Sequence, residues 1–119
     1  MIKVLVVDDD ADLLEMITMM LTANNMNIQS LSGGTSLFQM LSAQRPDLLL
    51  MDIFLGDSDG RQLCKQMKNS GQYSDVPVLL YSAGEISTAS IKESEADHFF
   101  RKPFEMHQLV NVIRESVKK

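Results

Sequence analysis

Three carboxylates that follow two apolar runs are the residues of this sequence best suited to chemistry. Asp8 and Asp9 come directly after the run VLVV, and Asp52 ends the run LLLM. Two carboxylates about 4 Å apart repel each other by roughly 4 kcal/mol at an effective dielectric near 20. If all three converge they need a cation, and ligation by oxygen alone suits Mg²⁺ better than zinc or copper.

Two further apolar runs end in groups that can act on a phosphoryl oxygen. Ser82 follows the run VLLY, and Lys102 stands two residues after the run HFF. A bound Mg²⁺ with Lys102 opposite would form a clamp for an incoming phosphoryl group. One carboxylate facing that group could act as the nucleophile and become an aspartyl phosphate. The Ser82 hydroxyl and the backbone N–H of Ala83 could donate to the phosphoryl oxygens.

These groups can meet only if the apolar runs lie side by side as strands. Five short apolar runs alternate with five segments of helical spacing, which predicts a parallel sheet with helices on both faces. Ligands of such a sheet gather beyond the carboxyl ends of its strands, where all the groups above would lie. Strands are expected at residues 2–7, 27–31, 47–52, 76–82 and 98–100, and helices at about 10–24, 35–45, 60–68, 85–95 and 105–117.

Length and composition are those of one globular domain. The 119 residues, 45% hydrophobic and 23% charged, can bury a core without disulfides, and Cys64 is the single cysteine. A net charge of −5 without a dense basic cluster argues against direct nucleic-acid binding. The apolar run after Met1 is too short to span a membrane. We therefore expect a single cytoplasmic domain over residues 1–119.

The chain resembles the receiver domain of two-component response regulators over almost its whole length. Five separate positions match the motif set of that family in the right order. The resemblance implies that Asp52 is the phosphoacceptor and that Asp9 ligates Mg²⁺ directly, with Asp8 acting largely through water. The backbone carbonyl of Phe54 would complete the metal shell. It also implies a flavodoxin-like, doubly wound sheet of strand order 2-1-3-4-5.

The remaining matches belong to the conformational switch of that family. Ser82 stands at the position of the switch hydroxyl, and Phe99 at that of the aromatic side chain that responds to it. Lys102 matches the conserved-type lysine, and Pro103 matches a proline that usually follows a cis peptide bond. A phenylalanine on a strand is also ordinary core, so a purely structural role for Phe99 stays open.

The resemblance further implies partners. A histidine kinase or a histidine phosphotransfer protein would donate the phosphoryl group, and a downstream protein would bind the surface formed by residues 85–119. The chemistry amounts to Mg²⁺-dependent self-phosphorylation and slow self-dephosphorylation, so the chain would be an enzyme in part only. The sequence leaves open whether phosphorylation drives a homodimer.

Two parts of the predicted site depart from the receiver pattern. Gly56 stands where a proline is often found, and Asp57 and Ser58 replace a less acidic, more apolar pair. We therefore expect a more flexible loop at this point. The bulky Phe54 and the small Gly84 should together alter the rate at which the phosphate is hydrolysed.

Two alternatives stay open at the level of sequence. VLVVDDDAD also fits haloacid-dehalogenase-like phosphatases, with Asp8 as nucleophile and Asp10 as acid/base. The chain could instead be a receiver-like module that binds partners and never carries phosphate. The more ordinary interpretations are helix caps or solvated charges for the acidic residues outside the cluster, core filling for most methionines, and a basic helix end for Lys118 and Lys119.

Overall fold

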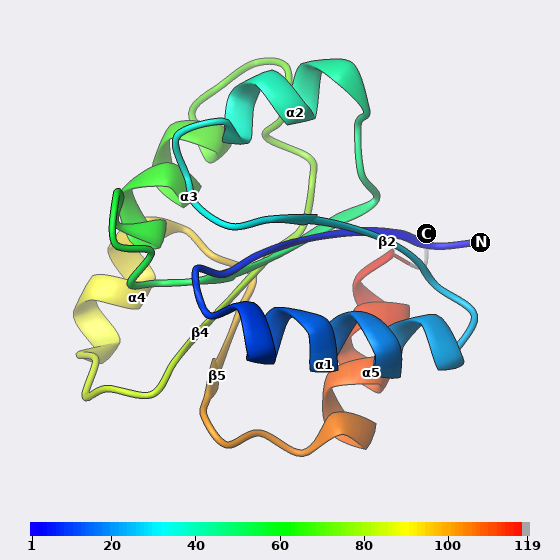
Figure 1. The fold of residues 1–119 in the computed structure, drawn as a ribbon. Coiled ribbons are helices and arrows are strands. Elements are labelled where there is room, and N and C mark those ends of the chain that lie inside the picture. The colour runs from blue at the N-terminus through cyan, green and yellow to red at the C-terminus, as the bar shows by residue number, and fades with distance from the viewer. Residues whose placement is uncertain (118–119) are drawn as a thin grey trace.

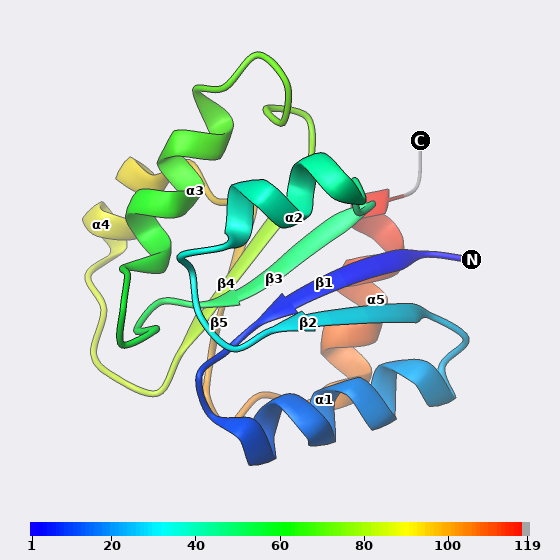
Figure 2. The same ribbon diagram turned by 45° about the horizontal axis from the view of Figure 1, so that its top comes forward.

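Five short aliphatic runs pair side by side into one parallel sheet in the computed structural model, which describes residues 1–117 (Figures 1 and 2). The strand order is β2-β1-β3-β4-β5, and every pairing is parallel. This confirms the expected α/β class and the order 2-1-3-4-5. The strands are β1 (Lys3–Val7), β2 (Asn27–Leu31), β3 (Leu48–Asp52), β4 (Val78–Ser82) and β5 (His98–Arg101).

Helices cover both faces of the sheet, and Figure 1 shows α2 and α3 above the strands and α1 and α5 below them. The apolar residues of α1 and α5 pack on one face, and those of α2, α3 and α4 pack on the other. The fold is therefore doubly wound, as predicted. The helices are α1 (Ala11–Ala23), α2 (Leu37–Ala43), α3 (Gly60–Lys68), α4 (Thr88–Ser94) and α5 (Met106–Val117).

The two central strands explain why their sequences read as unbroken apolar runs. All five residues of β3 and all five of β4 are buried, because helices cover both of their faces. Alternate residues enter different cores, so Leu50 packs toward α1 and α5 while Met51 packs toward α3. Asp52 and Ser82 are the last residues of these strands. The two buried parallel strands thus place two polar side chains at the same edge of the sheet.

Acidic side chains begin the helices that follow β1 and β3. Asp10 caps α1 by accepting from the N–H groups of Asp12 and Leu13, and Asp59 caps α3 by accepting from the N–H of Arg61. Thr35 and Ser36, residue types that favour helix caps, precede α2, but Ser36 makes no side-chain cap bond. The Thr35 hydroxyl donates to Asp57 instead.

Five of the nine methionines fill or border the core, as expected, but the three methionines of α1 do not. Met16, Met19 and Met20 are 48%, 65% and 37% exposed. The buried stripe of α1 is defined by Ile17 and Leu21, which lie one turn apart. Successive residues of a helix are rotated by about 100°, so the residues next to Ile17 and Leu21 in the sequence point away from the sheet. These methionines therefore form an exposed apolar face.

No helix in residues 1–117 is both long enough and apolar enough to cross a membrane. Lys118 and Lys119, expected as a basic helix end, lie outside the described residues. The rest of the 85–119 surface, expected to bind a downstream protein, comprises α4, β5, α5 and the loops between them.

Candidate functional site

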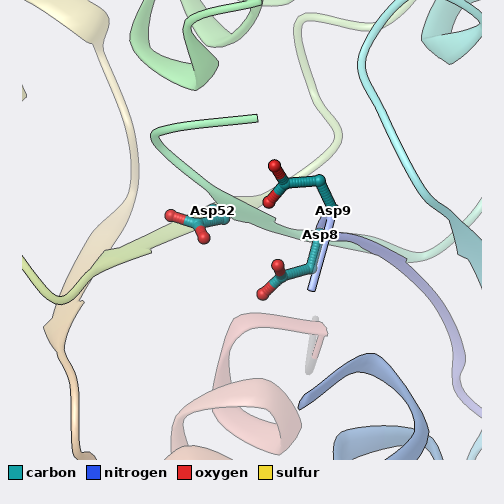
Figure 3. A group of neighbouring side chains, drawn as sticks. All are labelled: Asp8, Asp9 and Asp52. Atoms are coloured by element: carbon teal, nitrogen blue, oxygen red, sulfur yellow. The ribbon is translucent and has the colours of Figure 1, made fainter. Parts of the chain in front are cut away.

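The three carboxylates predicted to converge do so at the carboxyl edge of the sheet. Asp8 and Asp9 follow β1, and Asp52 ends β3, the neighbouring strand. Each can offer one oxygen such that all three oxygens lie within 4.8 Å of one another. Figure 3 shows both carboxylates of the first pair turned to the side of Asp52. Parallel pairing of β1 with β3 brings the two strand ends together.

Asp8 is the most enclosed of the three, with no exposed surface. Its Oδ1 accepts from the backbone N–H of Asp10 at 2.8 Å, and its Oδ2 accepts from the hydroxyl of Tyr81 at 2.6 Å. Lys102 Nζ lies 3.6 Å from the same Oδ2. A buried carboxylate needs such partners, since an unpaired buried charge is costly. Asp8 is therefore fixed on both of its oxygens.

Lys102, which directly follows β5, contacts the carboxylates at the ends of β1 and β3. Its Nζ donates to Asp52 Oδ2 at 3.1 Å. The backbone N–H of Phe54 donates to the other oxygen of Asp52 at 3.2 Å. Burial raises the pKa of Asp52 above its ordinary value; Lys102 opposes this rise, and the charge of Asp8 adds to it. Asp52 thus sits at an edge where negative charge is in excess.

The donor set fits a hard cation. Among residues 1–117, three carboxylates face the ammonium of Lys102, and its one positive charge leaves negative charge uncompensated. All the ligand atoms on offer are oxygens, which Mg²⁺ prefers. The residues that the resemblance assigns to a metal, Asp8, Asp9, Asp52 and the carbonyl of Phe54, are therefore compatible with Mg²⁺.

Phe54 forms the rim of the site. The residue is 52% exposed, and Cζ of Arg61 lies 5.6 Å from the centroid of its ring. A Cβ atom built on Gly84 would come within 3.6 Å of the ring, so the ring lies against the loop after β4. Arg61 also donates to the hydroxyl of Ser90 in α4 at 3.3 Å. The rim is thus continuous from the loop after β3 to α4.

The two switch candidates lie on the opposite side of the sheet from Asp8. Ser82 is fully buried, and its Oγ accepts from the N–H of Gly84 at 3.1 Å. Phe99 is partly buried and packs with the core formed by α2, α3 and α4. The bond between Lys102 and Pro103 is a cis peptide. Ser82 is the last residue of β4, whereas Phe99 lies on the neighbouring strand β5 beside Leu80, two residues before Ser82.

Asp57 does more than the solvated charge or helix cap expected of it. Its carboxylate accepts from the N–H of Gly34 at 3.0 Å and from the N–H of Thr35 at 3.2 Å, and also from the hydroxyls of Thr35 and Ser58. The Thr35 hydroxyl and the Gly34 amide are the main reasons why the pKa of Asp57 lies well below its ordinary value. Asp57 thereby joins the loop after β3 to the loop after β2. Greater flexibility of this loop stays a prediction.

Tyr81 is the residue of the site that the sequence did not reveal. It is fully buried on β4 and donates its hydroxyl to Asp8, which follows β1. Burial, and next the bond to Asp8, raise the pKa of the phenol, so its hydroxyl keeps its proton. A buried tyrosine generally needs a partner for its hydroxyl, and this was the available signal.

The phosphatase alternative is not favoured by the geometry. Asp10, its acid/base, directs Oδ1 to the amides of Asp12 and Leu13 at 3.1 and 3.2 Å as the cap of α1. Asp52, which that alternative leaves without a role, lies in the carboxylate cluster.

The chain matches known proteins over nearly its whole length. The family model described as "Response regulator receiver domain" matches residues 4–114. The response regulator MprA of Mycobacterium ulcerans is 28% identical over 115 residues, covering 95% of this chain and 49% of MprA. This chain therefore spans about half the length of the curated relatives it matches.

Solved structures share the fold. A Chloroflexus aurantiacus protein described as a response regulator has a TM-score of 0.92 at 27% identity, covering 99% of this chain and 98% of that one. The BeF3-activated receiver domain of Klebsiella pneumoniae RstA has a TM-score of 0.88 at 23% identity, covering 98% and 99%. At 23% identity the second likeness shows the fold alone.

Proposed function

The chain belongs to the response regulator receiver family, and from this premise we propose that residues 1–119 form one phosphorylatable receiver domain of a two-component phosphorelay. A histidine kinase or histidine phosphotransfer protein supplies the phosphoryl group, and Asp52 accepts it. The observation that carries the proposal is the convergence of three carboxylates with Lys102, whose Nζ lies 3.1 Å from Asp52.

Asp52 is the nucleophile in this proposal. One of its carboxylate oxygens forms the new O–P bond while the P–N bond of the donor phosphohistidine breaks. The electron pair of that bond returns to the imidazole, which takes up a proton. Lys102 lies between Asp8 and Asp52, where its ammonium can hold an oxygen of the transferred group.

Mg²⁺ is the proposed cofactor, held by Asp8, Asp9, Asp52 and the carbonyl of Phe54. When bound, it neutralises the carboxylates and lowers the repulsion between Asp52 and the anionic donor. Asp8 would act largely through water and Asp9 directly.

The proposed switch connects the site to a binding surface. The Ser82 hydroxyl and the Ala83 amide hold phosphoryl oxygens, Ser82 turns toward them, and Phe99 follows. The surface of residues 85–119 then binds a downstream protein or a second copy of the chain. The cytoplasm remains the expected compartment and nucleic acid is not an expected direct partner. The chemistry is limited to self-phosphorylation and slow self-dephosphorylation.

Intact mass after incubation with acetyl phosphate tests the proposal. Wild type, Asp52→Asn and Asp8→Asn are each incubated with acetyl phosphate, with Mg²⁺ or with a chelator. We expect wild type to gain one phosphoryl group only with Mg²⁺, and Asp52→Asn to gain none.

Two other results would overturn it. An adduct that survives Asp52→Asn but is lost with Asp8→Asn would revive the phosphatase alternative. A wild type that gains no mass, either from acetyl phosphate or from a phosphorylated histidine phosphotransfer protein, would leave the chain as a binding module without phosphate.

A further inference from the structure

Tyr81 contacts a negative and a positive group of the site, Asp8 and Lys102, from the buried side. Its hydroxyl donates to Asp8 Oδ2 at 2.6 Å, and Lys102 Nζ lies 4.9 Å from the centroid of its ring. Because β3 lies between β1 and β4, the side chain of Tyr81 reaches Asp8 from two strands away. One buried residue thus touches the first acidic residue and the lysine at once.

The surroundings of Tyr81 fix its ring in place. Tyr81 is fully buried, and the ring of Phe104 meets it edge-on with the centroids 5.6 Å apart. Phe104 in turn packs against Phe100 of β5 at 6.1 Å. A hydroxyl on so constrained a ring has a defined position, so it can define the position of the carboxylate that accepts from it.

Asp8 depends on Tyr81 for the closest contact of Oδ2, the oxygen beside Lys102. The N–H of Asp10 holds Oδ1, which leaves Oδ2 to Tyr81 and, at 3.6 Å, to Lys102. Lys102 also donates to Asp52 at 3.1 Å and is divided between the two acids. The Tyr81 hydroxyl therefore makes the shorter of the two contacts of Asp8 Oδ2, and unlike Lys102 it is not shared with Asp52. Removing it would free the carboxylate to turn.

We propose that Tyr81 is a positioning residue that orients the carboxylate of Asp8 for Mg²⁺ binding. The inference rests on the proposed function, because it assumes that the carboxylate cluster holds Mg²⁺. Partners that orient the groups around a metal change its affinity by about 10- to 100-fold when they are removed. We expect the lower end for Tyr81, because the hydroxyl acts through a single carboxylate.

The substitution Tyr81→Phe removes the hydroxyl and keeps the ring that packs against Lys102 and Phe104. Isothermal titration with Mg²⁺ should give a Kd about tenfold weaker than that of wild type. Tyr73→Phe is the matched control, because Tyr73 is also buried, at 8% exposure, but packs against Phe38 in the opposite layer. Its Kd should equal that of wild type.

A second readout separates positioning from general damage. The rate of phosphorylation by acetyl phosphate is measured against Mg²⁺ concentration. In Tyr81→Phe the half-saturating concentration should rise by the same factor as Kd, while the rate at saturating Mg²⁺ should stay near that of wild type. A structural defect would lower the saturating rate instead.

A double-mutant cycle tests whether Tyr81 acts through Asp8. In the Asp8→Ala background, which leaves no acceptor, adding Tyr81→Phe should change the Mg²⁺ affinity no further. An equal loss in both backgrounds would overturn the inference, as would a Tyr81→Phe protein that binds Mg²⁺ like wild type. A wild type that binds no Mg²⁺ would overturn the proposed function together with this inference.

Discussion

Phe54, two residues after the proposed phosphoacceptor, is a half-exposed side chain at the rim of the site. Its ring lies against the loop that contains Gly84, and Arg61 covers one of its faces. Neither phenylalanine nor glycine offers a group that could orient a water molecule toward a phosphorus atom on Asp52. The site should therefore hydrolyse its phosphate slowly.

Replacing Phe54 by asparagine should shorten the lifetime of the phosphorylated protein. An amide can hydrogen-bond a water molecule, and about 1 kcal/mol from that bond corresponds to roughly a fivefold faster hydrolysis. The measurement follows the decay of the phosphorylated mass after acetyl phosphate is removed. Phe54→Leu, which keeps an apolar rim, is the control and should decay like wild type. An unchanged lifetime in Phe54→Asn would reject the role of this residue.

A site residue could be predicted from the sequence when its position at the end of a strand was enough to bring it to the site. Asp52 and Lys102 could be identified as candidates because they lie at or just after the ends of apolar runs, and parallel strands end at one edge. Tyr81 could not, because the bond of its hydroxyl to Asp8, two strands away, depends on the direction of a buried side chain, which strand ends and strand order do not give. The order itself came from the family resemblance and not from the apolar pattern.

At the scale of elements, Asp57 connects two loops that carry the edge of the site. Its folded-state pKa lies below the ordinary value of 3.8, because the Thr35 hydroxyl and the Gly34 amide favour the charged form. A group with a lowered pKa stabilises the fold above its unfolded pKa. That stability is lost as pH falls through the folded pKa.

The substitution Asp57→Asn should therefore lower stability near neutral pH, and the difference from wild type should shrink below about pH 4. Urea unfolding at several pH values between 3 and 7 measures it. Glu93→Gln, which neutralises an exposed carboxyl of α4, is the control and should show little effect. A difference from wild type that stays constant over the whole range would contradict the role assigned to the charge of Asp57.

Local sequence predicted some helix starts well and missed other features of the elements. Asp10 and Asp59 were capping candidates by residue type, and both cap helices. Thr35 is also a capping candidate by residue type, but its hydroxyl donates to Asp57, a residue 22 positions later in the chain. Which acceptor a hydroxyl binds depends on how the loops pack, and residue type alone does not predict this.

For the molecule as a whole, the carboxylate cluster is a source of instability that a cation should relieve. Without Mg²⁺, Asp52→Asn should be more stable than wild type at neutral pH, because burial and Asp8 disfavour the charged form of Asp52. A gain of about 1 kcal/mol corresponds to a rise in Tm of roughly 4 °C for a domain of this size.

Thermal unfolding with and without Mg²⁺ measures this effect. The Tm of wild type should rise as Mg²⁺ is added, since a ligand that binds the folded state stabilises it. Asp52→Asn should gain less. The control Asp12→Asn removes an exposed carboxylate of α1 and should respond to Mg²⁺ like wild type. A lower Tm for Asp52→Asn in the absence of Mg²⁺ would show that the bond to Lys102 outweighs the repulsion.

The two ends of the described chain lie far from this chemistry. Met1 and Val117 line the same hollow, together with Asn25 and Asp47, which precede β2 and β3. That hollow is at the amino edge of the sheet, and the carboxylates are at the carboxyl edge. A fluorescent reporter attached near Met1 or Val117 would therefore lie at the edge of the sheet opposite to the proposed phosphorylation site. Such a reporter could follow phosphorylation without direct contact with the carboxylates.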